Sequence, residues 1–138
     1  MREIKFRGKS IMSDWLYGSL IFDERGKPCI VGVVVELCNE YVSLEHWQLV
    51  DEKSIGQFTG LKDKNGKEIW EGDILHWDGN PVEEYTKGKV HFVSGSFLIR
   101  FLPDGQDEIL ADQLDQEDWE VIGNIYENHE LLEGEESK

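Results

Sequence analysis

Short apolar runs separated by glycine-containing turns recur along this 138-residue chain and predict a fold built mainly of β-strands. Trp15–Phe22 and Pro28–Leu37 flank the turn Asp23–Gly26, a pattern typical of a hairpin. Lys87–Val93 and Phe97–Phe101 carry apolar side chains at intervals of two, so we expect one face of this second hairpin to be buried. The 14 glycines and three prolines agree with many tight turns between short strands.

The densest turn chemistry lies in residues 54–75. Asn65-Gly66 tolerates the positive φ angles of a two-residue hairpin turn, which predicts that Leu61 faces Glu68–Ile69 across it. Gly72-Asp73 then opens another apolar strand. Such a pair is common at the start of SH3-like small barrels, and a simple β-bend explains it equally well.

The pattern weakens after residue 103. Residues 119–126 are predicted to form a returning strand, and Asn128 is expected to cap one short helix around residues 130–132. The fold class that follows is mostly β, or β-rich α+β at most. We expect short antiparallel hairpins that form one or two small barrels, SH3-like in the central part, with a short C-terminal helix.

The chain length fits one domain, which we predict over residues 1–132. Asp51–Lys53 is the best candidate for a link between an N-terminal β lobe, residues 1–50, and a second β lobe, residues 54–126. Residues 133–138 are expected to form a disordered acidic tail.

The net charge of −15 is unevenly distributed and narrows the classes of partner. Residues 1–103 contain 16 acidic and 13 basic side chains, whereas residues 104–138 contain 13 acidic side chains and one basic side chain. Because binding nucleic acid requires Lys and Arg to displace its counterions, direct binding of DNA or RNA is not expected.

The cysteines and the apolar runs indicate an intracellular protein without a membrane segment. Cys29 and Cys38 are too few for a disulfide framework and are expected to be buried free thiols. The longest apolar run, Cys29–Val35, is too short to span a bilayer, and the chain starts with alternating charges rather than with a signal peptide.

Three blocks of the sequence resemble the YopX family. They are Lys5–Lys9 with Trp15–Gly18, the central signature Gly56–Ile74, and the closing block Trp119–Leu132, in which His129 stands where the family usually has proline. The signature positions are Gly56, Gln57, Gly60, Asn65, Gly66, Gly72 and Asp73. The resemblance implies a mostly β protein encoded by bacteriophages or prophages, present in the cytoplasm of the bacterial host and without an assigned biochemical activity.

Candidate chemistry is sparse, and no catalytic residue or cofactor is predicted. His76 and Asp78 would share one face of a strand, and His91 lies in a strand that pairs nearby, so these three are a weak candidate for a divalent metal site. Ordinary polar positions on half-exposed strands are the favoured interpretation. A cluster of Glu68, Glu71 and Asp73 is similarly read as turn residues rather than as paired catalytic carboxylates.

The large aromatic side chains have two interpretations. We favour a role in the β core, because small β domains need bulky apolar residues. Exposed aromatic residues would instead indicate an oligomer or a contact with a host protein. The residues concerned are Trp15, Tyr17, Trp47, Trp70, Trp77 and Trp119.

Two functional hypotheses follow. The first is an accessory protein that binds itself or a host protein, and in its more specific form the acidic segment 104–138 attracts a basic host surface. The candidate partner-binding residues are Asp112, Asp115, Glu117, Asp118 and Glu120, and an acidic C-terminal region is also an ordinary aid to solubility. The alternative hypothesis is a small metal-dependent enzyme, such as a nucleotide hydrolase, that uses His76, Asp78 and His91.

Overall fold

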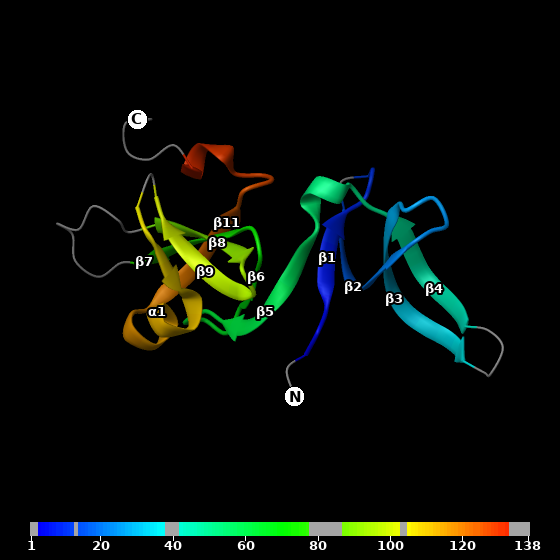
Figure 1. Ribbon diagram of the computed structural model, residues 1–138, viewed down its shortest axis with the longest axis horizontal. Helices are drawn as coiled ribbons and strands as arrows, with labels where there is room; N and C mark the ends of the chain where they lie inside the picture. Colours follow the sequence, from blue (N-terminus) through cyan, green and yellow to red (C-terminus); the bar gives the residue numbers. More distant parts are fainter. Residues whose placement is uncertain (1–2, 13, 38–41, 78–86, 103–104, 133–138) are drawn as a thin grey trace. The chain divides into compact units, whose positions relative to one another are not determined.

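The computed structural model describes residues 3–12, 14–37, 42–77, 87–102 and 105–132, and within these the side chains of all residues except 33–37, 42–46 and 132 (Figure 1). The chain divides into two compact units, residues 1–58 and residues 59–138. We call them the first and the second unit and describe each by itself. No helix in the described part of the chain is long and apolar enough to cross a membrane.

The first unit is an antiparallel sheet. Its elements are β1 (Phe6–Lys9), β2 (Trp15–Phe22), β3 (Pro28–Leu37), β4 (Val42–Leu49), the 3₁₀ turn η1 (Glu52–Ser54) and the beginning of β5 (Gly56–Lys62). The strand order is β4-β3-β2-β1-β5, and β6 (Glu68–Trp70) follows β5. The division between the units falls within β5, and residues 52–53 of the predicted link lie in η1.

Strand β2 changes its partner half-way along its length. Residues 15–18 pair with β1, and residues 19–22 pair with β3. Gly18, at the change, has a φ of +153°, and a Cβ atom at this position would lie 2.1 Å from the carbonyl oxygen of Val31. A side chain would collide with this backbone oxygen, so the approach of β3 to β2 requires glycine here.

The second unit holds the other sheet. Its elements after β6 are β7 (Asp73–Trp77), β8 (Lys87–Val93), β9 (Ser96–Phe101), β10 (Asp107–Ile109), the helix α1 (Leu110–Gln116), β11 (Trp119–Asn124) and the 3₁₀ turn η2 (His129–Leu132). The strand order is β10-β9-β8-β7-β11, and all pairs are antiparallel.

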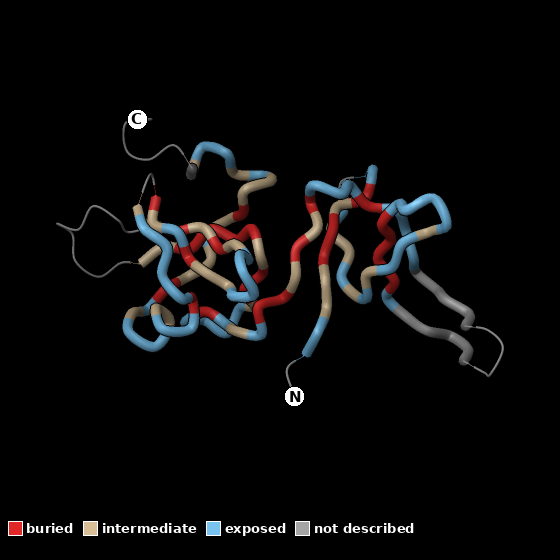
Figure 2. The backbone as a smooth tube through the Cα atoms, viewed as in Figure 1, coloured by how far each residue is buried: buried red, intermediate tan, exposed pale blue. Residues whose placement is uncertain are grey.

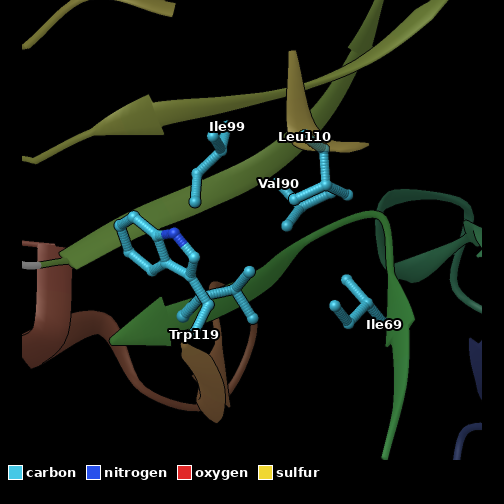
Figure 3. Close-up of a cluster of buried hydrophobic side chains, with 6 residues drawn as sticks. Ile69, Val90, Ile99, Leu110 and Trp119 are labelled. Atoms are coloured by element: carbon cyan, nitrogen blue, oxygen red, sulfur yellow. The ribbon is translucent and has the colours of Figure 1, made fainter. Parts of the chain in front are cut away.

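The core of the second unit is assembled from residues far apart in the sequence. Side chains from β6, β7, β8, β9, α1 and β11 form one buried cluster of Ile69, Leu75, Val90, Ile99, Leu110 and Trp119 (Figure 3). Buried residues, drawn red in Figure 2, occur in this unit on β6, β7, β8, β9 and β11. Burial of these apolar side chains is the main source of the unit's stability.

The prediction of a mostly β chain with short antiparallel hairpins and a short helix is confirmed. The predicted small barrels are wrong, because the described strands pair into a six-stranded and a five-stranded sheet, neither of which is a closed barrel. Gly72, with a φ of +95°, lies between β6, which pairs in the six-stranded sheet, and β7, which pairs in the five-stranded sheet.

The hairpin turns lie at the predicted positions, but not all of them have the predicted turn type. Asp63 N donates to the carbonyl oxygen of Lys67 (2.8 Å), so residues 64–66 form a three-residue loop, in which Gly66 has a φ of +83°. The expected two-residue turn at Asn65-Gly66 is therefore wrong. A turn with two positive φ angles occurs instead at Ser94-Gly95, between β8 and β9.

The helical elements differ from the prediction. Helix α1 was not predicted, although Leu110 is buried and Leu114 is packed against the core cluster. The expected C-terminal helix is the 3₁₀ turn η2, which directly follows Asn128, and Leu131 N donates to the backbone oxygen of Asn128 (2.9 Å). The side-chain oxygen of Asn128 accepts a hydrogen bond from Asn124 N (3.0 Å). The predicted tail 133–138 and the predicted thiol of Cys38 lie outside the described residues.

Candidate functional site

The carboxylate of Asp63 joins the signature to the closing strand β11. Its Oδ1 atom accepts hydrogen bonds from the backbone N–H groups of Asn65 and Lys67, both at 2.9 Å. Its Oδ2 atom accepts one from Val121 N, also at 2.9 Å and 58 positions away in the sequence. The backbone adds a bond from Lys64 N to the carbonyl oxygen of Trp119 (3.0 Å). With 7% of its surface exposed, Asp63 is a structural carboxylate in this arrangement.

Hydrogen bonding keeps Asp63 ionised despite its burial. Burial alone would raise the pKa of this carboxyl group, but the hydrogen bonds from Val121, Lys67 and Asn65 together lower the pKa below the ordinary value of 3.8. A general acid or base for neutral pH needs the opposite shift, toward the working pH. Asp63 is therefore not suited to acid–base catalysis.

The same turn occurs in the first unit without the long-range bond. Asp23 Oδ1 accepts from Arg25 N and Lys27 N, both at 2.8 Å, and Gly26 has a φ of +82°. The spacing Asp-x-x-Gly-Lys at residues 23–27 and 63–67 was a readable signal of this turn. Comparison of Asp23 with Asp63 therefore separates the local role of an aspartate in this turn from the long-range hydrogen bond that Asp63 accepts.

Gly72 brings the signature against the C-terminal block. Its N–H donates to Val90 O (2.8 Å), and its carbonyl oxygen accepts from Ile125 N (2.9 Å). A Cβ atom at Gly72 would lie 2.8 Å from the ring of Tyr126. The close approach of this ring and the φ of +95° both favour glycine.

Substitution Gly72→Ala is expected to lower the free energy of unfolding by about 2 kcal/mol or more, because a left-handed φ and a ring clash act together. Urea denaturation followed by circular dichroism measures the change. Gly66→Ala is the matched control. Its φ is +83°, and its Cβ would have no atom within 4 Å, so it should lose only about 1 kcal/mol. Equal losses in the two variants would contradict the role of Tyr126.

The closing block is held by two asparagines. Asn124 Oδ1 accepts from Tyr126 N (2.9 Å) and Glu127 N (3.0 Å), while Asn128 Oδ1 accepts from Asn124 N. These side chains satisfy backbone donors where β11 ends, which is the common use of asparagine in turns. Sequence analysis identified the block but not these roles.

The remaining signature residues also serve the fold. Gly56 and Gln57 lie opposite Arg7 and Phe6 in the β1–β5 pair. Gly60 has a φ of +84°. Asp73 is buried, and its Oδ2 atom accepts a hydrogen bond from Trp70 N (2.8 Å). The signature thus specifies turns and a junction between distant strands.

The structure does not bring the candidate metal ligands together within the described residues. His76 lies opposite Lys87 in the β7–β8 pair, and His91 lies four residues further along β8. At a rise of about 3.3 Å per residue, this places the two backbones about 13 Å apart. Asp78 lies outside the described residues, and no group of three His, Cys, Asp or Glu side chains within them could hold a metal ion.

His91 instead joins an ion-pair cluster across β8, β9 and β10. Arg100 donates through Nε to Asp107 Oδ1 (2.9 Å) and through Nη2 to Oδ2 (3.1 Å), while His91 Nε2 lies 3.0 Å from Oδ1. The hydrogen bond with Arg100, followed by that with His91, lowers the pKa of Asp107 to about 2. No hydroxyl or thiol of the described residues is hydrogen-bonded to this histidine, as a nucleophilic site would require. The cluster ties the short strand β10 to its sheet.

The predicted partner-binding acids lie along α1 and the start of β11. Asp112, Asp115 and Asp118 are exposed, and Glu117 and Glu120 are half-buried. Glu120 Oε1 lies 3.7 Å from the Nζ atom of Lys64. These carboxylates therefore lie within residues 112–120 and face solvent to different degrees.

The large aromatic residues divide between core and surface. Trp70 and Trp119 are buried, and Trp15 and Trp77 are half-buried. The guanidinium of Arg7 lies 4.6 Å from the ring centroid of Trp15. Tyr17 and Trp47 are 51% and 55% exposed. The core interpretation therefore holds for some of these residues, and the exposed ones need another explanation.

Comparisons with known proteins find a matching family model and a similar crystal structure. The family model described as YopX protein matches residues 5–133. The crystal structure of protein EF1440 from Enterococcus faecalis is similar, with 29% sequence identity and a TM-score of 0.69, over 96% of this chain and 100% of that one. No protein with a curated description matches the chain.

Proposed function

This chain belongs to the YopX protein family, and we propose that it is a phage- or prophage-encoded accessory protein that acts by binding a protein of its bacterial host. The contact takes place in the host cytoplasm and uses the acidic surface of the second unit. The partner presents a basic surface, such as that of a DNA-binding protein. Catalysis has no part in this function.

The observation that carries the proposal is the orientation of α1. Leu110 and Leu114, one helical turn apart, face the core, so Asp112 and Asp115 are left on the exposed side of the helix. Asp118 follows on the exposed connection to β11. The fold therefore presents two carboxylates on the exposed side of a helix that is anchored by Leu110 and Leu114, and a third carboxylate on the connection that follows it.

The charge of the second unit supports the same function. Residues 59–138 contain 20 acidic and seven basic side chains, a net charge of −13, whereas residues 1–58 contain nine acidic and seven basic side chains. A concentrated negative field speeds the encounter with a basic protein and makes binding depend on salt. The signature residues support the proposed function only indirectly. Their hydrogen bonds stabilise the fold that presents the acidic surface.

We expect the triple variant Asp112→Asn, Asp115→Asn, Asp118→Asn to lose its binding to a basic host protein. Wild type is expected to capture this protein from host lysate at low salt and to release it at high salt. The triple variant should bind it at least tenfold more weakly, as measured with the purified partner by titration calorimetry. Asp14→Asn, Glu24→Gln, Glu52→Gln is the matched control, because it removes three exposed acids from the first unit.

Equal weakening by both triple variants would show that only the total charge matters and would contradict a contact at α1. Capture of the same protein by wild type and by the α1 variant at all salt concentrations would also contradict it. Recovery of no partner by wild type would overturn the proposed function and leave the acids as an aid to solubility.

A further inference from the structure

The turn between β5 and β6 contains a pair of residues that can react with each other. Asn65 and Gly66 are the one Asn-Gly pair of this chain, and both are exposed. Asparagine side chains are chemically labile, and a backbone nitrogen attacks the preceding asparagine most readily when it belongs to glycine, which has no side chain to hinder the approach. A Cβ atom at Gly66 would have no atom within 4 Å, so the space around the pair is open. The turn thus holds the residues that spontaneous deamidation requires.

Hydrogen bonds to Asp63 oppose this reaction in the folded turn. Gly66 N donates to the backbone oxygen of Asp63 (3.0 Å), so the nitrogen that would attack is held in place. Asn65 N and Lys67 N donate to Asp63 Oδ1, both at 2.9 Å, which fixes the backbone on either side of Gly66. Attack on the side-chain carbon of Asn65 therefore requires a local opening of the turn.

We infer that Asn65 is a deamidation site and that the carboxylate of Asp63 controls the rate of the reaction. In the opened turn, the backbone nitrogen of Gly66 attacks the side-chain carbonyl carbon of Asn65 and forms a carbon–nitrogen bond. The proton of this backbone amide passes through solvent to the side-chain nitrogen of Asn65, which leaves as ammonia. Water then opens the succinimide ring at either of its carbonyl carbons, and aspartate or isoaspartate remains at position 65.

Both products loosen the junction between the turn and β11. Aspartate adds a carboxylate beside that of Asp63, and like charges repel. Isoaspartate lengthens the backbone of a three-residue loop that is closed by the bond from Asp63 N to the carbonyl oxygen of Lys67 (2.8 Å). The position of Asp63 then changes, so its Oδ2 atom loses the geometry of its bond from Val121 N. A reaction at one exposed residue therefore acts on a contact 58 positions apart in the sequence.

The equivalent turn of the first unit supplies an internal comparison. Asp23 Oδ1 also accepts two backbone bonds, and Gly26 also has a positive φ, but Arg25 stands at the position that corresponds to Asn65. The turn therefore forms without asparagine at this position. Asn65→Arg is consequently a variant that removes the reactive amide and keeps the turn. The inference does not rest on the proposed contact with a host protein, because the reaction needs only this chain and water.

Incubation of the purified full chain at neutral and at mildly alkaline pH tests the inference, with mass spectrometry of the peptide that contains residue 65 as the measurement. Wild type is expected to accumulate aspartate and isoaspartate at Asn65. The reaction should be faster at the higher pH, because the attacking nitrogen must lose its proton. Asn124 and Asn128 are internal controls and should remain unchanged, because isoleucine and histidine follow them.

Variants test the role of Asp63 in this reaction. Asp63→Ala should react at least tenfold faster than wild type, because the turn opens more often, and Asp63→Asn should lie between the two. Gly72→Ala is the matched control. It destabilises the same unit, but Gly72 makes none of the hydrogen bonds of the turn, so this variant should react as wild type does. Circular dichroism shows that each variant is folded.

Aged protein gives a second measurement. Wild type that has largely reacted at Asn65 should unfold at a lower urea concentration than fresh wild type, whereas aged and fresh Asn65→Arg should agree. Absence of the reaction at Asn65, or equal rates in wild type and both Asp63 variants, overturns the inference. A rate for Gly72→Ala as high as that for Asp63→Ala, or an unchanged stability of the reacted wild type, overturns it as well.

Discussion

Substitution Trp119→Ala is expected to lower the free energy of unfolding by about 4 kcal/mol, the largest effect of any single change considered for this chain. The indole of Trp119 is 1% exposed and belongs to the core cluster with Val90 and Ile99 (Figure 3). Its ring centroid lies 6.0 Å from that of Phe101 and 6.1 Å from that of Trp77. Removing it leaves a cavity that these side chains fill only in part.

Trp119→Phe separates the volume of the side chain from its polar atom. The Nε1 atom of Trp119 is buried without a hydrogen-bond partner among the described residues, a state that costs about 1–3 kcal/mol. Phenylalanine removes this penalty and part of the packing, so the net loss should be only about 1–2 kcal/mol.

Urea denaturation followed by circular dichroism measures the stability of both Trp119 variants. An unchanged slope of the free energy of unfolding against urea concentration shows that the substitution changes stability alone. Trp47→Ala is the control, because Trp47 is 55% exposed. A loss at Trp119→Ala no larger than that at Trp47→Ala would contradict the core described here.

Substitution Asp63→Ala is expected to lower the free energy of unfolding by about 3 kcal/mol, because it leaves backbone donors without their acceptor. Asn65 N, Lys67 N and Val121 N all lose a hydrogen bond, and the bond to Val121 connects the signature to β11. Asp63→Asn keeps one carbonyl oxygen and should lose less. Asp23→Ala, in the same local turn but without the long-range bond, should lose least.

The effect of Asp63 should depend on pH with a definite sign. Its pKa in the folded chain is lowered below 3.8, so the ionised carboxylate stabilises the folded state at neutral pH. This contribution is complete above the ordinary pKa and is lost as the pH falls through the lowered folded value. The difference between wild type and Asp63→Asn, measured by urea denaturation from pH 7 to pH 2, should therefore shrink only below about pH 4. A difference that shrinks already between pH 7 and pH 5 would contradict this assignment.

The hairpins were predictable because their causes are local. Asp23–Gly26 and Ser94-Gly95 contain residues that accept turn geometry, and the flanking strands alternate or continue apolar positions. The YopX signature was equally visible. Its three blocks led to the family without any tertiary information, and the family model now covers residues 5–133.

Helix α1 was missed for a physical reason. Its only apolar anchors are Leu110 and Leu114, in a background of acidic and amide side chains, so the sequence has no long apolar stripe. The helix is stabilised by burying Leu110 in a core made by β6, β7, β8, β9 and β11. Because most helical stability in proteins comes from such packing, a short helix of this kind is hard to recognise before the core is known.

The candidate metal site depended on strand register. Sequence spacing placed His76 and His91 on neighbouring strands, which the structure bears out, but the pairing of His76 with Lys87 separates them along β8. The register of a strand pair depends on both strands and on the loop that connects them. A pattern within one strand therefore does not determine it.

The sequence by itself determined the strand-rich class of this chain, the position of its hairpins, its uneven charge and its family, because each of these depends on neighbouring residues or on composition. Only the tertiary structure decided that a six-stranded and a five-stranded sheet form, that Asp63 binds the backbone of Val121, and that Trp119 is buried while Trp47 is exposed. These features depend on contacts between residues far apart in the sequence. Their free energies arise only when both partners are in place, so no local pattern contains them.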